Sequence, residues 1–185
     1  MKNILLSIGA ASFIAALCAA NLQAAETNTN TTATRIGIYD SRAVAFAWFW
    51  SGKHQTQLNE LMQSARAAKA AGDTNRFTDF AAKLRQHQDD MHREVFSTAP
   101  ATNALAALKE QLPEIQKEAG VSALVSKWDD AALKKYTDAE KVDVTDPIVR
   151  EFHLPEKQLK MIPEIEKHAP LPLEKCEELI RKGEI

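Results

Sequence analysis

Two stripes of apolar residues on either side of Ala71-Gly72-Asp73 constrain this chain more than any other feature. Before that turn, apolar side chains recur at alternating spacings of three and four, at Leu58, Leu61, Ala65 and Ala68. After it the same spacing joins Phe77, Phe80, Leu84 and Val95, with His87 and Met91 on the same stripe. Each set falls on one face of a helix. The sequence therefore predicts an antiparallel helical hairpin over residues 54–95, in which small residues of one arm face large residues of the other.

Three short segments outside the hairpin alternate apolar and polar residues, which is the period of a β-strand. They span residues 35–40, 121–128 and 141–144. We therefore expect an α+β chain, mostly α, in which the hairpin projects from a small β base. A helical tail over residues 153–185 is interrupted by prolines, with helical pieces expected at 156–162 and 173–181.

The segment between the first strand and the hairpin is unusually aromatic. Asp40 or Ser41 can cap a helix that begins with the run 43–50, and Ser51-Gly52 is expected to bend the chain afterwards. One interpretation is that the aromatic run is buried, in the core or in a contact between subunits. The other is that it forms an apolar surface for a ligand or client. The residues of this candidate interaction surface are Phe46, Trp48, Phe49, Trp50 and Trp128.

The segment between the hairpin and the tail carries further helix signals. A helix is expected to start near Ala101, to kink or restart at Pro113 and to end at Gly120. Residues 129–140 are polar and are predicted to form a loop with one helical turn. Thr145-Asp146-Pro147 combines a hydroxyl cap, an acid and a proline, which is typical of a helix start.

The first 25 residues have the pattern of a secretory signal peptide. One lysine precedes an apolar run over residues 4–20, and small residues follow, with cleavage expected after Ala24 or Ala25. The run is too short and poorly flanked for a stable membrane span. Residues 26–34 are rich in Thr and Asn and are predicted to form a disordered tether. The sequence thus predicts a periplasmic or secreted protein.

Charge and cysteine content argue against a basic nucleic-acid-binding protein and against a fold held together by internal disulfides. Removing residues 1–25 leaves 22 basic and 25 acidic residues, so a basic surface for nucleic acid is not expected. Cys176 would then be the one remaining cysteine, which allows no internal disulfide. Its thiol is expected to be buried, the alternative being a link between two copies.

The sequence has no glycine-rich phosphate loop, no paired-cysteine metal site and no Gly-x-Ser-x-Gly motif, so we expect no enzyme activity and no cofactor. His87 and His92 are five residues apart and thus about 140° apart around a helix, which is poor geometry for sharing a metal. His87 is instead expected on the hairpin seam near Leu58 and His54. Protonation of such a seam near pH 6 would place charge in an apolar contact.

Charged residues follow two of the predicted strands. Asp40 and Arg42 lie at the end of the first strand, and Asp143 and Asp146 at the end of the third. They are expected to gather at one rim if the strands form one sheet. Helix caps or a structural ion pair explain them better than a catalytic pair of carboxylates.

The order of these segments, and several short motifs, resemble one known family. The motifs are Arg35-Ile36-Gly37-Ile38-Tyr39-Asp40-Ser41-Arg42 before the hairpin, Lys117-Glu118-Ala119-Gly120-Val121 with Ala123-Leu124-Val125-Ser126-Lys127, and Val142-Asp143-Val144-Thr145-Asp146-Pro147-Ile148-Val149. Over residues 35–152 the chain resembles the Skp/OmpH-like periplasmic chaperones, and Tyr39-Asp40-Ser41-Arg42 is also similar to uncharacterised exported bacterial proteins. The arms here are shorter and less basic than those of that family.

The resemblance implies a homotrimeric β base whose coiled-coil-like arms surround a cavity for unfolded envelope proteins, held without ATP. The leading hypothesis is therefore an exported, non-enzymatic, chaperone-like binding protein. The alternative is a periplasmic domain that binds a small ligand or a metal through the aromatic helix or the His87 region. An exported hydrolase is a third hypothesis.

Overall fold

The computed structural model describes residues 34–185, which form one compact unit. The predicted signal peptide and nearly all of the predicted tether lie outside the described residues. The described part is mostly helical with one small sheet, as expected from the sequence. Among these residues, no helix combines the length and the apolar character needed to cross a membrane.

The sheet contains three short strands in the order β2-β1-β3. Their bounds are β1 Arg35–Tyr39, β2 Leu124–Ser126 and β3 Glu140–Asp143, so β2 is much shorter than predicted. Both pairs are parallel, and Ile38 of β1 is in register with Val125 and with Asp143. All three strands therefore end at the same edge of the sheet.

The central strand requires a glycine for packing. A Cβ atom at Gly37 would lie 2.8 Å from the Leu124 Cδ2 atom and 2.9 Å from the Val144 Cγ2 atom. These distances are too short for carbon atoms, so Gly37 allows the chains beside β1 to approach it closely.

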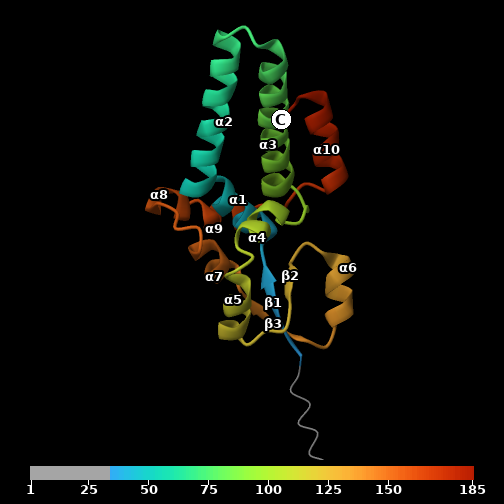
Figure 1. Cartoon of the computed structure of the whole chain (residues 1–185). Helices are drawn as coiled ribbons and strands as arrows, with labels where there is room; N and C mark the ends of the chain where they lie inside the picture. Colours follow the sequence, from blue (N-terminus) through green and yellow to red (C-terminus); the bar gives the residue numbers. More distant parts are fainter. Residues whose placement is uncertain (1–33) are drawn as a thin grey trace, which may run out of the picture. The chain divides into compact units, whose positions relative to one another are not determined.

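The helix α1 (Ser41–Phe49) follows β1 directly, and every one of its residues is buried. Its N-cap is Asp40, whose carboxylate accepts a hydrogen bond from the Arg42 backbone N–H. Helices α2, α3, α4, α7 and α9 all contact α1. Figure 1 shows α1 between the sheet and the α2–α3 pair.

The predicted bend at Ser51-Gly52 separates α1 from α2 (Gly52–Ala70), and Ser51 caps α2 by accepting from the His54 N–H. The next helix, α3 (Thr74–Phe96), begins after the turn at Ala71-Gly72-Asp73. Gly72 has φ of 69°, a left-handed conformation that ends α2 without strain. The α2 and α3 helices pack against each other and lie side by side in Figure 1.

Shorter helices complete the base. These are α4 (Thr102–Ala107), α5 (Leu112–Ala119), α6 (Asp130–Leu133), the 3₁₀ turn η1 (Lys134–Tyr136) and α7 (Thr145–Arg150). The predicted restart at Pro113 is confirmed by the break between α4 and α5, and Gly120 ends α5 in a left-handed conformation. The predicted hydroxyl cap is wrong: Val144 is the N-cap of α7 and Thr145 is its first residue, whose backbone N–H donates to the Asp143 carboxylate.

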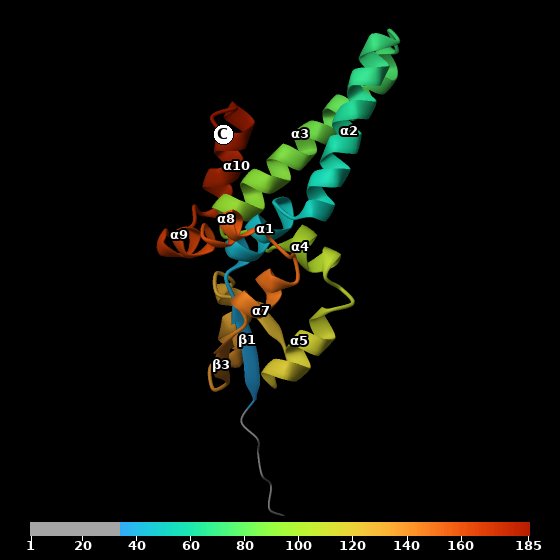
Figure 2. The same ribbon diagram turned by 90° about the vertical axis from the view of Figure 1, so that its left-hand side faces the viewer.

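The tail returns to the rest of the molecule. It contains α8 (Glu156–Leu159), α9 (Ile162–Lys167) and α10 (Leu173–Lys182). Figure 2 shows α9 beside α1 and α10 beside α3, where Cys176 is buried as predicted. The Leu171 N–H donates to the Phe96 carbonyl and the Leu171 carbonyl accepts from the Thr98 N–H, which attaches the tail to the end of α3.

Candidate functional site

An apolar groove of about 460 Å³ opens between α2 and α3 where both helices meet α1. Its walls come from three helices and one cap residue: Phe49 of α1 with Trp50, the C-cap of α1, then His54, Gln55, Leu58 and Met62 of α2, and Leu84, His87, Gln88 and Met91 of α3. The Leu and Met side chains among them are only half-buried. Apolar surface is therefore accessible from solvent inside the groove.

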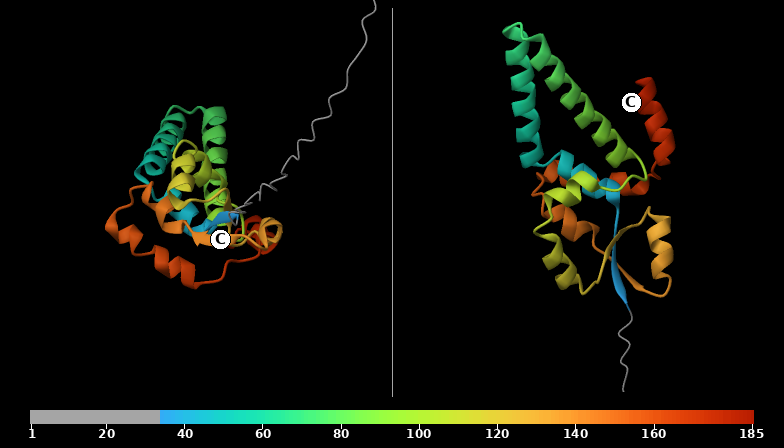
Figure 3. Two further views of the ribbon diagram at one scale, coloured as in Figure 1. Left: turned by 90° about the horizontal axis from the view of Figure 1, so that it is seen from below. Right: turned by 45° about the vertical axis from the view of Figure 1, so that its right-hand side comes forward.

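The groove exists because α2 and α3 diverge. Near the turn, Ala65 and Ala68 are buried and allow close packing. Toward α1 the facing residues are large, and the ring of Trp50, stacked 4.6 Å from Phe46, contributes to the wall. Figure 3 shows the two helices meeting at the turn and separating toward α1. The apolar stripes predict that α2 and α3 pack against each other along their whole length. In the structure they pack closely only near the turn, and the groove separates them toward α1.

Two histidines meet on the α1 side of this groove. His54 is 3% exposed, and its ring lies 5.5 Å from that of His87, 5.1 Å from Trp48 and 4.9 Å from Phe49. The His54 Nδ1 atom is buried and has no hydrogen-bond partner among the described residues. Burial, with a smaller contribution from His87, lowers the pKa of His54 to about 4. For His54, the protonation expected near pH 6 is therefore displaced to more acidic pH.

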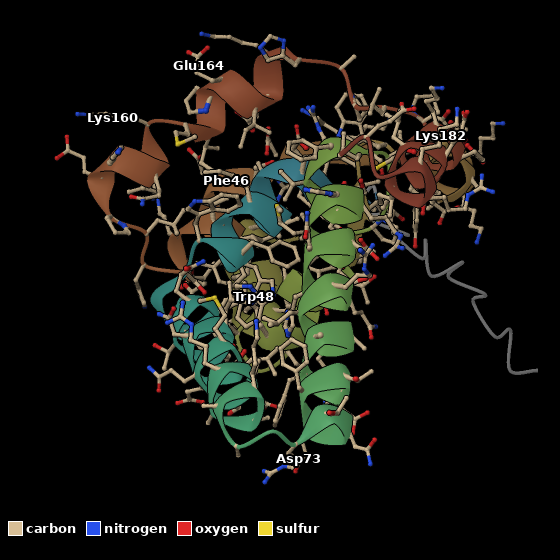
Figure 4. The ribbon with its side chains drawn as sticks, turned by 90° about the horizontal axis from the view of Figure 1, so that it is seen from above. Phe46, Trp48, Asp73, Lys160, Glu164 and Lys182 are labelled. Carbon is tan, nitrogen blue, oxygen red and sulfur yellow. The ribbon has the colours of Figure 1, made fainter. Side chains whose placement is uncertain are left out.

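The prediction that the aromatic run of α1 forms an exposed interaction surface is wrong, because most of its side chains are buried. Phe46 and Phe49 are each 3% exposed and Trp48 is 9% exposed, because α1 is enclosed by helices on several sides. Figure 4 shows Phe46 and Trp48 on α1 at the centre of the molecule. Of the four aromatic residues in this run, Phe49 and the half-buried Trp50 border the groove. The alternative interpretation, burial in the core, is the one the structure supports.

Trp128 belongs to a different part of the molecule. Its indole Nε1–H donates to the Asp40 Oδ1 atom over 3.1 Å. The guanidinium of Arg42 and the ammonium of Lys127 lie 5.0 and 4.9 Å from its ring centroid. Trp128 also borders a smaller cavity of about 260 Å³ beside β2, which includes Tyr39.

Asp40 is the centre of this second cluster. The carboxylate is fully buried and pairs with Arg42 over 3.2 Å and with Lys127 over 2.8 Å. Burial alone would raise the pKa of Asp40, but hydrogen bonds from Lys127, Trp128 and Arg42 outweigh it and hold the pKa below its usual value. The contacts of Asp40 with Lys127 and Trp128 join the segment after β2 to the start of α1.

The charged residues that follow the strands do share one edge, because the strands are parallel. Burial raises the pKa of Glu166; Lys127 opposes this, and the carboxylates of Asp40, Asp143 and Asp146 add smaller effects that raise it further. The Thr145 hydroxyl accepts from the Asp40 N–H. Asp40 is the N-cap of α1, and the Asp143 carboxylate accepts a hydrogen bond from the Thr145 backbone N–H. These contacts favour the non-catalytic interpretation.

Among residues 34–185, no cluster of three or more His, Cys, Asp or Glu side chains is arranged to hold a metal ion. His92 pairs with Phe96, with ring centroids 5.8 Å apart, while His87 contacts His54. The structure thus gives no support to a metal site shared by His87 and His92.

The sequence did not single out the groove. Gln55, Met62 and Gln88 were not identified, and Leu58 and Met91 were expected inside a closed seam. One signal was present: facing residues are small near the turn, at Ala65 and Ala68, and large farther away. Such a gradient favours divergence of two packed helices.

No family model, curated protein or solved structure matches this chain. The resemblance to Skp/OmpH-like chaperones therefore remains a hypothesis.

Proposed function

We propose that this protein is an exported, non-enzymatic binding protein that holds apolar segments of unfolded envelope proteins without nucleotide. The observation that supports this proposal is the groove between α2 and α3, which leaves Leu and Met side chains half-buried. Export rests on the signal pattern of residues 1–25.

The chemistry of the groove suits varied apolar partners. Met62 and Met91 on opposite walls have flexible, polarizable side chains that adapt to different shapes. Gln55 and Gln88 add amides that can bond to the backbone of an extended peptide. In this proposal α2 and α3 act as an antiparallel hairpin that projects from the base and grips the client.

The order of the elements is consistent with the chaperone hypothesis. From β1 to α7 the order is a strand, a helix, a long helical pair, two short helices, a strand, two short helical segments, a strand and a short helix. The segments on which the resemblance rests follow one another in that order. A homotrimer and a periplasmic location are parts of the same proposal. A solution mass measured by light scattering after size-exclusion chromatography tests the trimer directly.

A small ligand is the second candidate. The groove volume of about 460 Å³ falls within the usual range of small-molecule sites, roughly 300–1,000 Å³. The His54 Nδ1 atom, which has no hydrogen-bond partner among residues 34–185, would give such a ligand one polar contact.

The test is an aggregation assay with an unfolded outer-membrane β-barrel protein, followed by light scattering without ATP. The wild-type protein is expected to delay aggregation, and Leu58→Gln in the groove is expected to weaken that effect at least threefold. Leu159→Gln is the matched control, since Leu159 is 39% exposed on α8 and outside the groove. No delay by the wild type, or equal delay by both variants, would reject the proposal.

A further inference from the structure

Two imidazole rings and one thioether side chain line the same groove. His54 of α2 and His87 of α3 have ring centroids 5.5 Å apart. Met91 is four residues after His87, so the two side chains share one face of α3. All three residues line the same groove.

The His54 ring has an unmet requirement for a partner. Its Nδ1 atom is buried without a hydrogen bond among the described residues, and leaving a buried polar atom unpaired destabilises the folded state. Two imidazole nitrogens that bind one metal at about 2.0 Å lie about 4 Å apart or less. Rings with centroids 5.5 Å apart reach that separation by rotating toward each other.

The surroundings select the kind of metal. The residues that line the groove include no carboxylate and no thiolate, so the charge of a divalent cation would not be neutralised. Hard cations such as Mg²⁺ and Ca²⁺ need oxygen ligands, whereas thioether sulfur favours Cu(I). Cu(I) carries a single charge, and the indole of Trp50 in the groove wall adds a favourable surface for a cation.

We propose that His54, His87 and Met91 form a Cu(I) site at the α1 end of the groove. The site consists of a thioether and two neutral imidazoles. It is therefore compatible with the absence, among residues 34–185, of a group of three or more His, Cys, Asp or Glu side chains that could hold a metal ion. It does not rest on chaperone activity, since the metal would lie on the α1 side of the groove whether or not a peptide occupies the remainder.

The test is an anaerobic competition for Cu(I), kept reduced with ascorbate, between the protein and a chromogenic Cu(I) chelator. The wild type is expected to hold one Cu(I) per chain, and His87→Gln and Met91→Leu each to weaken binding at least tenfold. Met91→Leu nearly conserves side-chain volume, so its thermal unfolding without metal should stay close to that of the wild type. Met161→Leu is the matched control, since Met161 is 44% exposed and lies outside the groove.

X-ray absorption of the copper-loaded protein gives an independent readout. Nitrogen and sulfur neighbours are expected in the wild type, with the sulfur lost in Met91→Leu. Failure to retain copper against the chelator, wild-type affinity in both ligand variants, or a copper shell without sulfur would each overturn the proposal. The aggregation assay without copper is unaffected by any of these results, so the two proposals fail separately.

Discussion

The Nζ atom of Lys127 lies 2.8 Å from the Oδ2 atom of Asp40, and this contact ties the end of β2 to the start of α1. Because the Asp40 carboxylate is fully buried, it also neutralises the guanidinium of Arg42, whose side chain is 4% exposed. Removing the acid would leave Arg42 charged and unpaired inside the molecule.

Asp40→Ala is therefore expected to destabilise the fold by about 3–5 kcal/mol, the usual cost of breaking a buried ion pair from one side. Urea unfolding followed by circular dichroism measures the change. Asp146→Ala is the control, because Asp146 is an exposed residue on the same edge of the sheet; its effect should stay within about 1 kcal/mol. A loss below about 1 kcal/mol in Asp40→Ala would show that Asp40 does not hold this edge together.

A second prediction concerns acid stability. Burial lowers the pKa of His54 to about 4 from an ordinary value of 6.5. The unfolded chain binds a proton at this residue at higher pH than the folded chain does. The free energy of unfolding therefore has its full value above pH 6.5. It decreases as the pH falls toward 4, by about 3 kcal/mol in all.

His54→Phe should remove that part of the acid dependence. The measurement is the free energy of unfolding in urea between pH 4 and pH 7, for the wild type and the variant. His168→Phe, at an exposed site after α9, should keep the wild-type slope. An unchanged slope in His54→Phe would contradict a neutral, buried His54.

The helical part of this fold was largely predictable, and the reasons are local. Turn chemistry at Gly72 and Asp73, proline at Pro113 and glycine at Gly120 determine where helices begin and end. These signals act within one or two helical turns, so they can be identified from the sequence alone.

The direction of the strands and the position of the groove were not predictable in this way. Alternation in β1 indicates which residues face each side of a sheet but not whether its neighbours are parallel. The groove lies where α2 and α3 meet α1. It therefore depends on contacts between three helices, and the spacing of residues within one helix does not reveal such contacts. The aromatic run of α1 was placed correctly as a helix start, but its burial results from helices far along the chain, including α9.

A third prediction tests the packing of the sheet. Gly37→Ala would place a methyl group 2.8 Å from a Leu124 side-chain carbon and 2.9 Å from one of Val144. Overpacking of this kind typically costs about 1–3 kcal/mol. Gly52→Ala is the matched control, since the added carbon meets no atom within 4 Å beyond its chain neighbours and the backbone of its own helix. Differential scanning calorimetry should show a lower Tm for Gly37→Ala alone, and equal values would exclude the close approach.

The last prediction concerns Glu94, near the end of α3, which is 5% exposed. Its Oε1 atom accepts hydrogen bonds from the backbone N–H and the side-chain amide of Asn103, while its Oε2 atom is buried without a partner among the described residues. Burial raises the pKa of Glu94 to about 7, against the opposing effect of the Asn103 hydrogen bonds. The unfolded chain therefore releases this proton at lower pH than the folded chain.

For such a group, stability is fully present below pH 4.5 and is lost as the pH rises to about 7, by about 3 kcal/mol. Glu94→Gln keeps an acceptor for Asn103 and cannot ionise, so it should gain stability relative to the wild type as the pH rises. His54 has the opposite slope between pH 4.5 and 6.5, and the two effects overlap in the wild type. The decisive quantity is therefore the difference in unfolding free energy between Glu94→Gln and the wild type, measured from pH 4.5 to 8. That difference should grow in favour of the variant, whereas Glu118→Gln at an exposed site should show none; a pH-independent difference would mean that Glu94 is already ionised in the folded protein.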